Sequence, residues 1–147
     1  MQAYRHILMA TDFGAGSEIV ARRAHDLAQR NQAKLTLLHV VDYMPIADSA
    51  YGPAVPFDVE LSDELVQTAK RRLLSMAQDL GVAESDCVVE IGSPKVEVIR
   101  IAEENGVDLI VVGTHGKHGL QLLLGSTSSS LLHYTRCDVL AVRLKKD

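Results

Sequence analysis

Five short runs of β-branched and aliphatic residues recur along the chain, each about as long as a β-strand. Several are apolar at consecutive positions rather than at alternate ones, which is typical of strands covered on both faces. The runs are His6–Ala10, Leu35–Val41, Cys87–Ile91, Leu109–Val112 and Val139–Val142. The pattern therefore predicts five strands of a buried sheet.

Between these runs lie segments whose apolar residues recur with the period of a helix. The predicted helices are Ser17–Asn31, Leu61–Leu80, Pro94–Asn105 and a fourth from near Gly125 to about Tyr134. Ser93 before Pro94 fits a helix start, and Gly81 and Gly106 fall where helices would end. Strands and helices thus alternate along the chain.

This alternation predicts the α/β class, with a doubly wound parallel sheet and helices on both faces. No internal repeat or linker divides residues 1–147, so we expect a single domain. The one long irregular stretch, Asp42–Glu60, contains three of the four prolines and is expected to be a binding loop or a cover over a site.

Charge and composition narrow the class of partner. The chain has 15 basic and 19 acidic residues, a formal charge of −4 and a pI near 5.8, which argues against a nucleic-acid-binding surface. Its longest apolar run, Leu109–Val112, is far too short for a membrane span, and no export signal is evident. Cys87 and Cys137 are expected to be reduced, buried thiols, so we expect a cytoplasmic protein.

Three strand ends carry residues suited to ligand binding. The first strand ends at Thr11-Asp12, the second at His39–Asp42, and the fourth opens into the glycine-rich segment Gly113–Gly119. In open parallel sheets the ligand crevice lies beyond the carboxyl ends of the strands, where the strand order reverses. If the first and fourth strands are neighbours, Asp12 faces the glycine-rich segment across a nucleotide pocket. An aspartate here is also typical of a turn or a helix cap.

The glycine-rich segment is the best candidate for a phosphate site. Gly113, Gly116 and Gly119 allow close approach of the backbone, and Gly125–Thr127 opens the last predicted helix. Free N–H groups and two hydroxyls at a helix start bind anions, and Lys117 supplies a cation nearby. The alternative interpretation is that this segment holds only a turn and a helix cap.

Other signatures are weak. No serine or threonine follows the glycine-lysine pair at 116–117, as a P-loop requires, because His118 stands there. Gly14 and Gly16 lack the third glycine of a dinucleotide fingerprint. His115 and His118 have no accompanying cluster of carboxylates or cysteines, so no protein metal site is predicted. His39 interrupts an apolar strand and is interpreted as a hydrogen-bonded core histidine.

The segment Gly113-Thr114-His115-Gly116, with Gly125-Ser126 after it, resembles the nucleotide loop of the universal stress protein (UspA-type) family. Tyr4–Asp12 resembles the opening strand of that family, Leu37–Val41 its second strand and Cys137–Val142 its closing strand. The resemblance runs from about residue 4 to residue 144. It implies a five-stranded parallel sheet in the order 3-2-1-4-5, a role in stress survival, and a homodimer joined through Val139–Val142.

The resemblance also implies the ligand and its contacts. Asp12 and the backbone of Val40 would hold the adenosine part of ATP or AMP, with no metal beyond a nucleotide-bound Mg²⁺. The phosphates would be lined by the loop residues Gly113, His115, Gly116, Lys117, Gly125, Ser126 and Thr127. Nucleotide-binding members follow G-x2-G-x9-G-[ST], whereas this chain reads G-x2-G-x8-G-S, one residue shorter.

Three functions follow in order. The first is a cytoplasmic, homodimeric stress-response protein that binds an adenine nucleotide at Gly113–Thr127. The second is a dimer of the same kind that binds no nucleotide and acts through protein contacts. The third is an enzyme with slow ATP hydrolysis or adenylyl transfer, although the sequence offers no nucleophile–base pair. Neither nucleic acid nor membrane is expected as a partner.

Overall fold

The computed structural model describes residues 3–42, 59–113 and 134–144. Its centre is a parallel sheet in the order β3-β2-β1-β4-β5, which confirms the predicted fold class and strand order. The strands are β1 (His6–Ala10), β2 (Lys34–Asp42), β3 (Cys87–Gly92), β4 (Leu109–Gly113) and β5 (Asp138–Val142). β1 lies in the middle and pairs with β2 on one side and β4 on the other.

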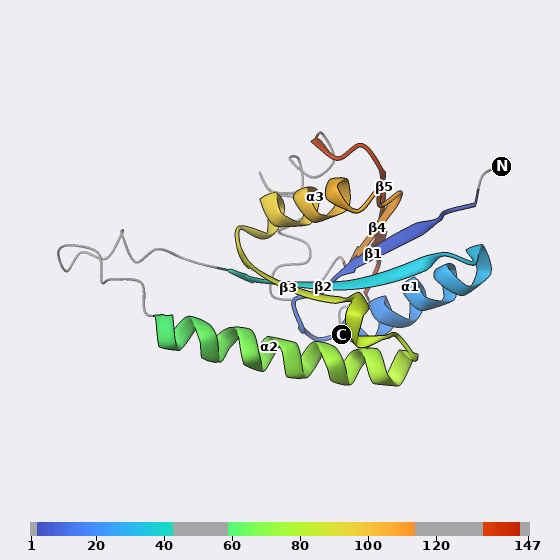
Figure 1. Cartoon of the computed structure of the whole chain (residues 1–147). Helices are drawn as coiled ribbons and strands as arrows, with labels where there is room; N and C mark the ends of the chain where they lie inside the picture. The colour runs from blue at the N-terminus through green and yellow to red at the C-terminus, as the bar shows by residue number, and fades with distance from the viewer. Residues whose placement is uncertain (1–2, 43–58, 114–133, 145–147) are drawn as a thin grey trace.

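Helices cover both faces of the sheet (Figure 1). α1 (Ser17–Asn31) and α2 (Val59–Leu80) lie on one face and α3 (Pro94–Glu104) on the other. A short 3₁₀ helix, η2 (Glu84–Asp86), leads into β3. This division follows from right-handed crossovers, because the chain first winds from β1 towards β3 and then returns to β4.

The predicted helix bounds need small corrections. α1 has the predicted bounds, α2 begins two residues before Leu61, and α3 ends one residue early because Asn105 caps it. Of the irregular stretch expected over Asp42–Glu60, Asp42 belongs to β2 and Glu60 to α2, and residues 43–58 lie outside the described residues. Residues 125–133 of the predicted fourth helix lie outside the described residues.

The consecutive apolar residues of the strands are explained by two cores. Ile7 and Met9 of β1 point to the core beneath α1 and α2, whereas Leu8, between them, points to the core beneath α3. All three side chains are fully buried. Successive strand residues face opposite sides, so a strand covered on both faces must be apolar at every position.

The amino ends of the strands are tied together by hydrogen bonds within the protein. The Asp108 carboxylate accepts the backbone N–H groups of Arg5, at 2.8 Å, and of His6, at 3.0 Å. His6 Nδ1 donates to the Asn105 carbonyl at 3.1 Å, and in this tautomer its Nε2 accepts the Thr36 hydroxyl at 2.7 Å. These contacts join β1, β2 and the segment entering β4.

Leu144, the last described residue, packs against the start of α1. Gly16 has a φ of +89°, and a Cβ added there would lie 2.6 Å from Cδ1 of Leu144. Leu144 is itself buried, just beyond β5. Glycine at position 16 therefore meets both a conformational and a steric requirement.

The sequence predicts that both cysteines are reduced and buried. Cys87 and Cys137 are free, as predicted, but half-buried rather than buried, because Cys87 begins the edge strand β3 and Cys137 directly precedes the other edge strand, β5. Their burial is nevertheless the main cause that raises the pKa of both thiols.

None of the described helices has the length and apolar character needed to cross a bilayer.

Candidate functional site

A pocket of about 450 Å³ opens at the carboxyl ends of the central strands. Residues following β1, at the end of β2 and at the end of β4 line it, together with side chains of α2 and α3. Its volume lies within the usual range of small-molecule sites, roughly 300–1,000 Å³. It also lies where the chain direction across the sheet reverses, which is the expected ligand position in this architecture.

Three of the predicted site residues meet at this pocket. Asp12 follows β1, Val40 lies in β2 and Gly113 ends β4, and all three line the cavity. They are adjacent because β1 lies between β2 and β4. The other predicted residues, which are His115, Gly116, Lys117, Gly125, Ser126 and Thr127, lie outside the described residues.

Asp12 belongs to a tight turn as well as to the pocket wall. Its Oδ1 accepts the backbone N–H of Gly14 at 2.8 Å, which is the pattern of an Asx turn. The turn continues into α1 through Ser17, whose hydroxyl donates to the Gly14 carbonyl at 2.7 Å. The two interpretations of Asp12 left open by the sequence, a turn residue and a pocket residue, are therefore compatible in this fold.

Val40 presents its backbone to the pocket. The Leu38 carbonyl accepts the N–H of Thr11 at 2.9 Å, and the β1–β2 pairing ends at Ala10–Leu38. Peptide groups two residues apart in a strand face the same side. The N–H and C=O of Val40 therefore face the side of β1 beyond the last paired residue, where the pocket lies.

Sequence reasoning missed part of the pocket wall. Phe13 and Arg72 both line the cavity, and Arg72 comes from α2, whose apolar pattern predicts only core packing. A signal was present in that helix, because Leu65, Thr68 and Arg72 recur at the spacing of one helical face. His39 is hydrogen-bonded, as predicted, but it is half-buried and lines the pocket rather than lying in the core.

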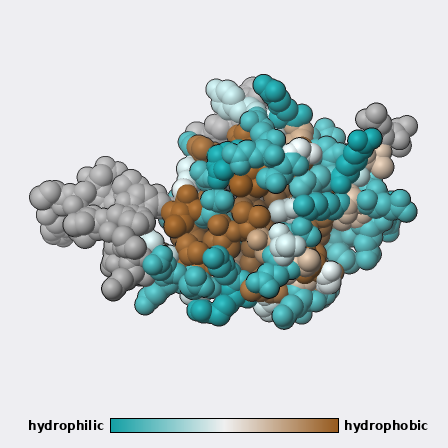
Figure 2. Space-filling view, in the orientation of Figure 1, coloured by the Kyte–Doolittle hydropathy of each residue, from teal (hydrophilic) through white to brown (hydrophobic). Residues whose placement is uncertain are grey.

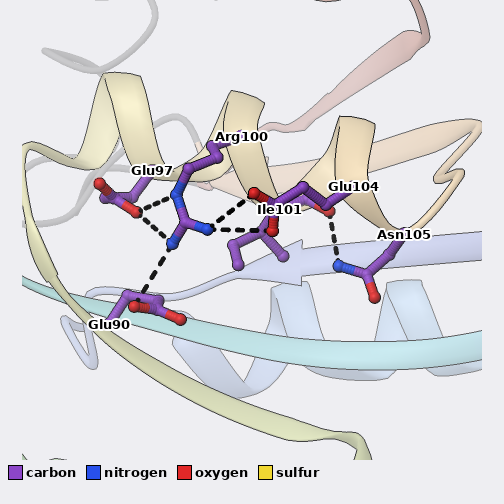
Figure 3. A network of polar contacts seen from close by, with 6 residues as sticks. All are labelled: Glu90, Glu97, Arg100, Ile101, Glu104 and Asn105. Atoms are coloured by element: carbon purple, nitrogen blue, oxygen red, sulfur yellow. Dashed lines mark hydrogen bonds and ion pairs between the residues drawn. The ribbon is translucent and has the colours of Figure 1, made fainter.

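The opposite wall is supplied by α3, which an ion-pair network joins to β3 (Figure 3). The Arg100 guanidinium lies 2.6 Å from Glu97, 3.0 Å from Glu104 and 3.4 Å from Glu90 of β3. Hydrogen bonds to Glu97 and Glu104 raise the pKa of Arg100. Because these side chains keep 17–57% of their surface in contact with solvent, each ion pair is expected to contribute little to the stability of the fold. Pro94 and Val98 of the same helix line the pocket.

The surface around these elements is not uniformly polar. In the orientation of Figure 1, Figure 2 shows hydrophobic residues gathered over β2 and β3, with hydrophilic residues around them. Near the cavity, Leu65 is 48% exposed and Ile91 is 39% exposed. A partly apolar pocket with a few polar groups suits a ligand that has a flat apolar ring and polar edges.

The described part of the chain contains no group of three or more His, Cys, Asp or Glu side chains placed to hold a metal ion. The polar groups of the pocket instead include the carboxylates of Asp12 and Asp42, the guanidinium of Arg72 and peptide groups of β2. This arrangement suits recognition by hydrogen bonds.

Comparison with known proteins shows which family the chain resembles. The model of the universal stress protein family matches residues 3–143. Universal stress protein A homolog 2 of Coxiella burnetii is 41% identical over 146 residues, which is 99% of each chain.

Solved structures agree with the sequence comparison. The structure of protein MJ0577 of Methanocaldococcus jannaschii superposes with a TM-score of 0.78 at 30% identity and covers 99% of both chains. A universal stress protein solved in complex with cAMP superposes with a TM-score of 0.63, covering 95% of this chain and 97% of that one. Its identity of 24% shows a shared fold alone.

Proposed function

This chain belongs to the universal stress protein family, and from that premise we propose that it binds an adenine nucleotide, ATP or AMP, at the carboxyl end of its sheet. The proposal describes a cytoplasmic, homodimeric stress-response protein whose residues 1–147 fold as one domain. Binding of the nucleotide, rather than its turnover, is the proposed activity.

One observation carries the proposal. Asp12, Val40 and Gly113 are far apart in the sequence, yet all three line one cavity of about 450 Å³. They are also the only residues of the expected nucleotide site that fall within the described ranges 3–42, 59–113 and 134–144. A cavity at the point where the strand order reverses supports the same assignment.

The backbone of Val40 fits the edge of an adenine ring. Adenine presents an amine donor beside a ring-nitrogen acceptor on its pairing edge, so an open C=O and N–H on one strand match it. The Val40 peptide groups face the pocket and can therefore pair with this edge of adenine.

The remaining contacts follow the chemistry of the nucleotide. The Asp12 carboxylate is suited to accept hydrogen bonds from ribose hydroxyls beside the base. The phosphates would lie along the loop that begins at Gly113 and ends at Gly125–Thr127, with His115 and Lys117 beside them. The same fold holds an adenine nucleotide in the cAMP-bound protein, which supports the proposal at the level of architecture.

The test combines the native protein with variants of the loop. Mass spectrometry of ligand released from freshly purified protein, and calorimetry with ATP and AMP, should detect an adenine nucleotide. Gly116→Val should abolish binding, whereas Ala83→Val, at an exposed extended position before β3, should leave it unchanged. No retained nucleotide and no heat with either ligand would contradict the proposal.

A second candidate function has a specific observation in its favour. The spacing between Gly116 and Gly125 is one residue shorter than in nucleotide-binding members, and one extended residue spans about 3.3–3.6 Å. That length exceeds a hydrogen-bond distance of about 2.7–3.2 Å, so the loss of one residue can remove a phosphate contact, and a dimer that binds no nucleotide is the alternative. Inserting one residue after Leu120 separates the two cases, because it should tighten nucleotide binding if the loop length is the only defect.

The proposed dimer uses the free edge of β5. β5 is the last strand in the sheet, and along it Val139 and Leu140 are half-buried while Ala141 is exposed. Pairing with a second copy would satisfy the backbone groups of this edge and cover these residues. Light scattering should give a dimer, and Ala141→Glu should shift it to monomer, whereas Gln29→Glu on the exposed face of α1 should not. A native monomer of 16.0 kDa at micromolar concentration would contradict it.

A further inference from the structure

Phe13, immediately after Asp12, has an unfavourable backbone conformation. Its φ is +60°, and among the described residues other than glycine only Gln32 shares a positive φ. Gln32 caps the end of α1, where this conformation is common. A bulky aromatic residue gains nothing locally from the left-handed region, so surrounding contacts must hold it there.

The Phe13 ring is held by β2 and α2. The His39 ring lies 4.3 Å from the Phe13 ring between centroids, at an interplanar angle of 32°. The Arg72 guanidinium lies over the Phe13 ring at 4.5 Å from its centroid, and Arg72 Nη2 donates to the Phe13 carbonyl at 3.4 Å. Both the ring and the peptide of Phe13 are thereby fixed from outside the turn.

The same groups also fix the other side of Asp12. His39 Nδ1 donates to the Thr11 carbonyl at 2.7 Å, and the Phe13 N–H donates to the Thr11 hydroxyl at 3.0 Å. The Asx-turn bond from the Gly14 N–H to Asp12 Oδ1 lies within this frame. His39 and Arg72 thus hold the residues before and after the carboxylate.

We propose that Arg72 is a positioning residue that acts through Phe13, whose ring also contacts His39, to hold the Asp12 carboxylate in its binding geometry. This inference rests on the proposed nucleotide binding, in which Asp12 contacts the ribose. Hydrogen bonds to a carboxylate depend on distances of about 2.5–2.9 Å, so a small rotation of the turn weakens them. Because Arg72 is proposed to act through Asp12, its substitution should weaken the binding of the nucleoside part of the ligand and not the contacts to the phosphates.

The test uses variants of Phe13 and Arg72 with matched controls. Phe13→Gly permits the same backbone conformation without the ring, and Phe13→Tyr retains the ring. Arg72→Met removes the guanidinium, Arg72→Lys restores a cation, and Arg71→Met is the control from the next position of α2, outside the pocket. Binding of adenosine, AMP and ATP is measured by calorimetry, and hydrogen exchange of the Gly14 amide is measured without nucleotide.

We expect Phe13→Gly and Arg72→Met to weaken all three ligands about equally, by about 5- to 10-fold, with faster exchange at Gly14. Arg71→Met should behave as the native protein, whereas Phe13→Tyr, which keeps the ring, and Arg72→Lys, which keeps a cation, should each lose less than Phe13→Gly and Arg72→Met. If Phe13→Gly fails to fold, the Arg72 variants alone decide.

Two results would overturn the inference. One is unchanged Gly14 exchange and adenosine affinity in Arg72→Met. The other is a loss confined to ATP and AMP, which would make Arg72 a direct phosphate ligand instead. If the native protein binds none of the three ligands, the proposed function fails, and exchange at Gly14 then decides the positioning role by itself.

Discussion

The two ends of the sheet are built from the same strands but differ in what surrounds their backbone. At the amino end, Asp108, His6 and Thr36 satisfy one another and the neighbouring peptide groups with short hydrogen bonds. At the carboxyl end, a cavity, a strained Phe13 and the open peptide of Val40 occupy the corresponding places. Polar residues at the amino end contact only the protein, whereas several of those at the carboxyl end also line the cavity.

This difference shows how to interpret polar residues in a parallel sheet. A buried polar side chain with all its partners inside the protein costs stability when it is changed. Substitution of a polar side chain that lines a cavity is expected to change the affinity for a ligand instead, because its polar atoms face the space that the ligand would occupy. Substitution of a polar residue should therefore lower the stability of the protein at the amino end and lower ligand affinity at the carboxyl end.

The largest effect is expected from Asp108→Ala at the amino end. The substitution leaves the N–H groups of Arg5 and His6 without their acceptor, so the free energy of unfolding should fall by about 2–4 kcal/mol. Guanidinium unfolding measures the fall, and nucleotide affinity should be unchanged. Asp26→Ala, an exposed aspartate 3.8 Å from Arg30, should cost less than about 0.5 kcal/mol.

The next effect is expected from Asp12→Asn at the carboxyl end. An asparagine side-chain oxygen still accepts the Gly14 N–H, so the turn and the unfolding free energy should be retained. The charge-assisted bonds proposed between Asp12 and the ribose would be lost, which should weaken adenosine binding by about 1.5–3 kcal/mol in calorimetry. A drop in stability without a drop in affinity would erase the distinction between the two ends.

Equal substitutions of two threonines give a more sensitive comparison. Thr36→Val removes the donor to the buried His6 Nε2 and should lower the unfolding free energy by about 1–2 kcal/mol. Thr68→Val, on the exposed face of α2, should change it by less than about 0.5 kcal/mol. Similar losses at both positions would show that the amino-end network has no special role in stability.

The smallest effect concerns Tyr4, whose hydroxyl donates to Asp138 at 2.7 Å. That hydrogen bond, then burial and the nearby charges of Asp138 and Asp108, raises the pKa of Tyr4 above 10.0. The stabilisation is therefore complete below pH 10.0 and is lost as the pH rises through the raised pKa of the folded state. Tyr4→Phe should be less stable by at most about 0.5 kcal/mol at pH 8.

The difference between native protein and Tyr4→Phe should shrink above pH 10 in unfolding curves measured across that range. A difference that is constant with pH would mean that the phenol does not contribute through its hydroxyl. Because Tyr4 joins the amino end to the edge strand β5, this result also measures how far the closed network extends.

Much of the fold could be predicted from the sequence because both cores leave a pattern in it. Consecutive apolar residues such as Ile7, Leu8 and Met9 mark a strand covered on both faces, and the alternation with helices fixes the class. The strand order came instead from a resemblance, since pattern alone does not say which strands are neighbours. The bounds of α2 were wrong by two residues because helix ends depend on local capping.

The site could be predicted only where a residue acts through its own chemistry. Asp12 and Gly113 were identified from their type and place at strand ends, and Val40 from the resemblance. Phe13 and Arg72 were missed because their role depends on contacts between β1, β2 and α2, which no local pattern records.

The contact between Gly16 and Leu144 has a consequence for biosynthesis. The ribosome releases the amino terminus first, and at about 5–20 residues per second the interval between these two positions is on the order of ten seconds. For most of that time β1 lacks β4 beside it, and Leu144 reaches the start of α1 only at the end of synthesis. The contact at Gly16 is therefore among the last of the described core contacts that the nascent chain can form.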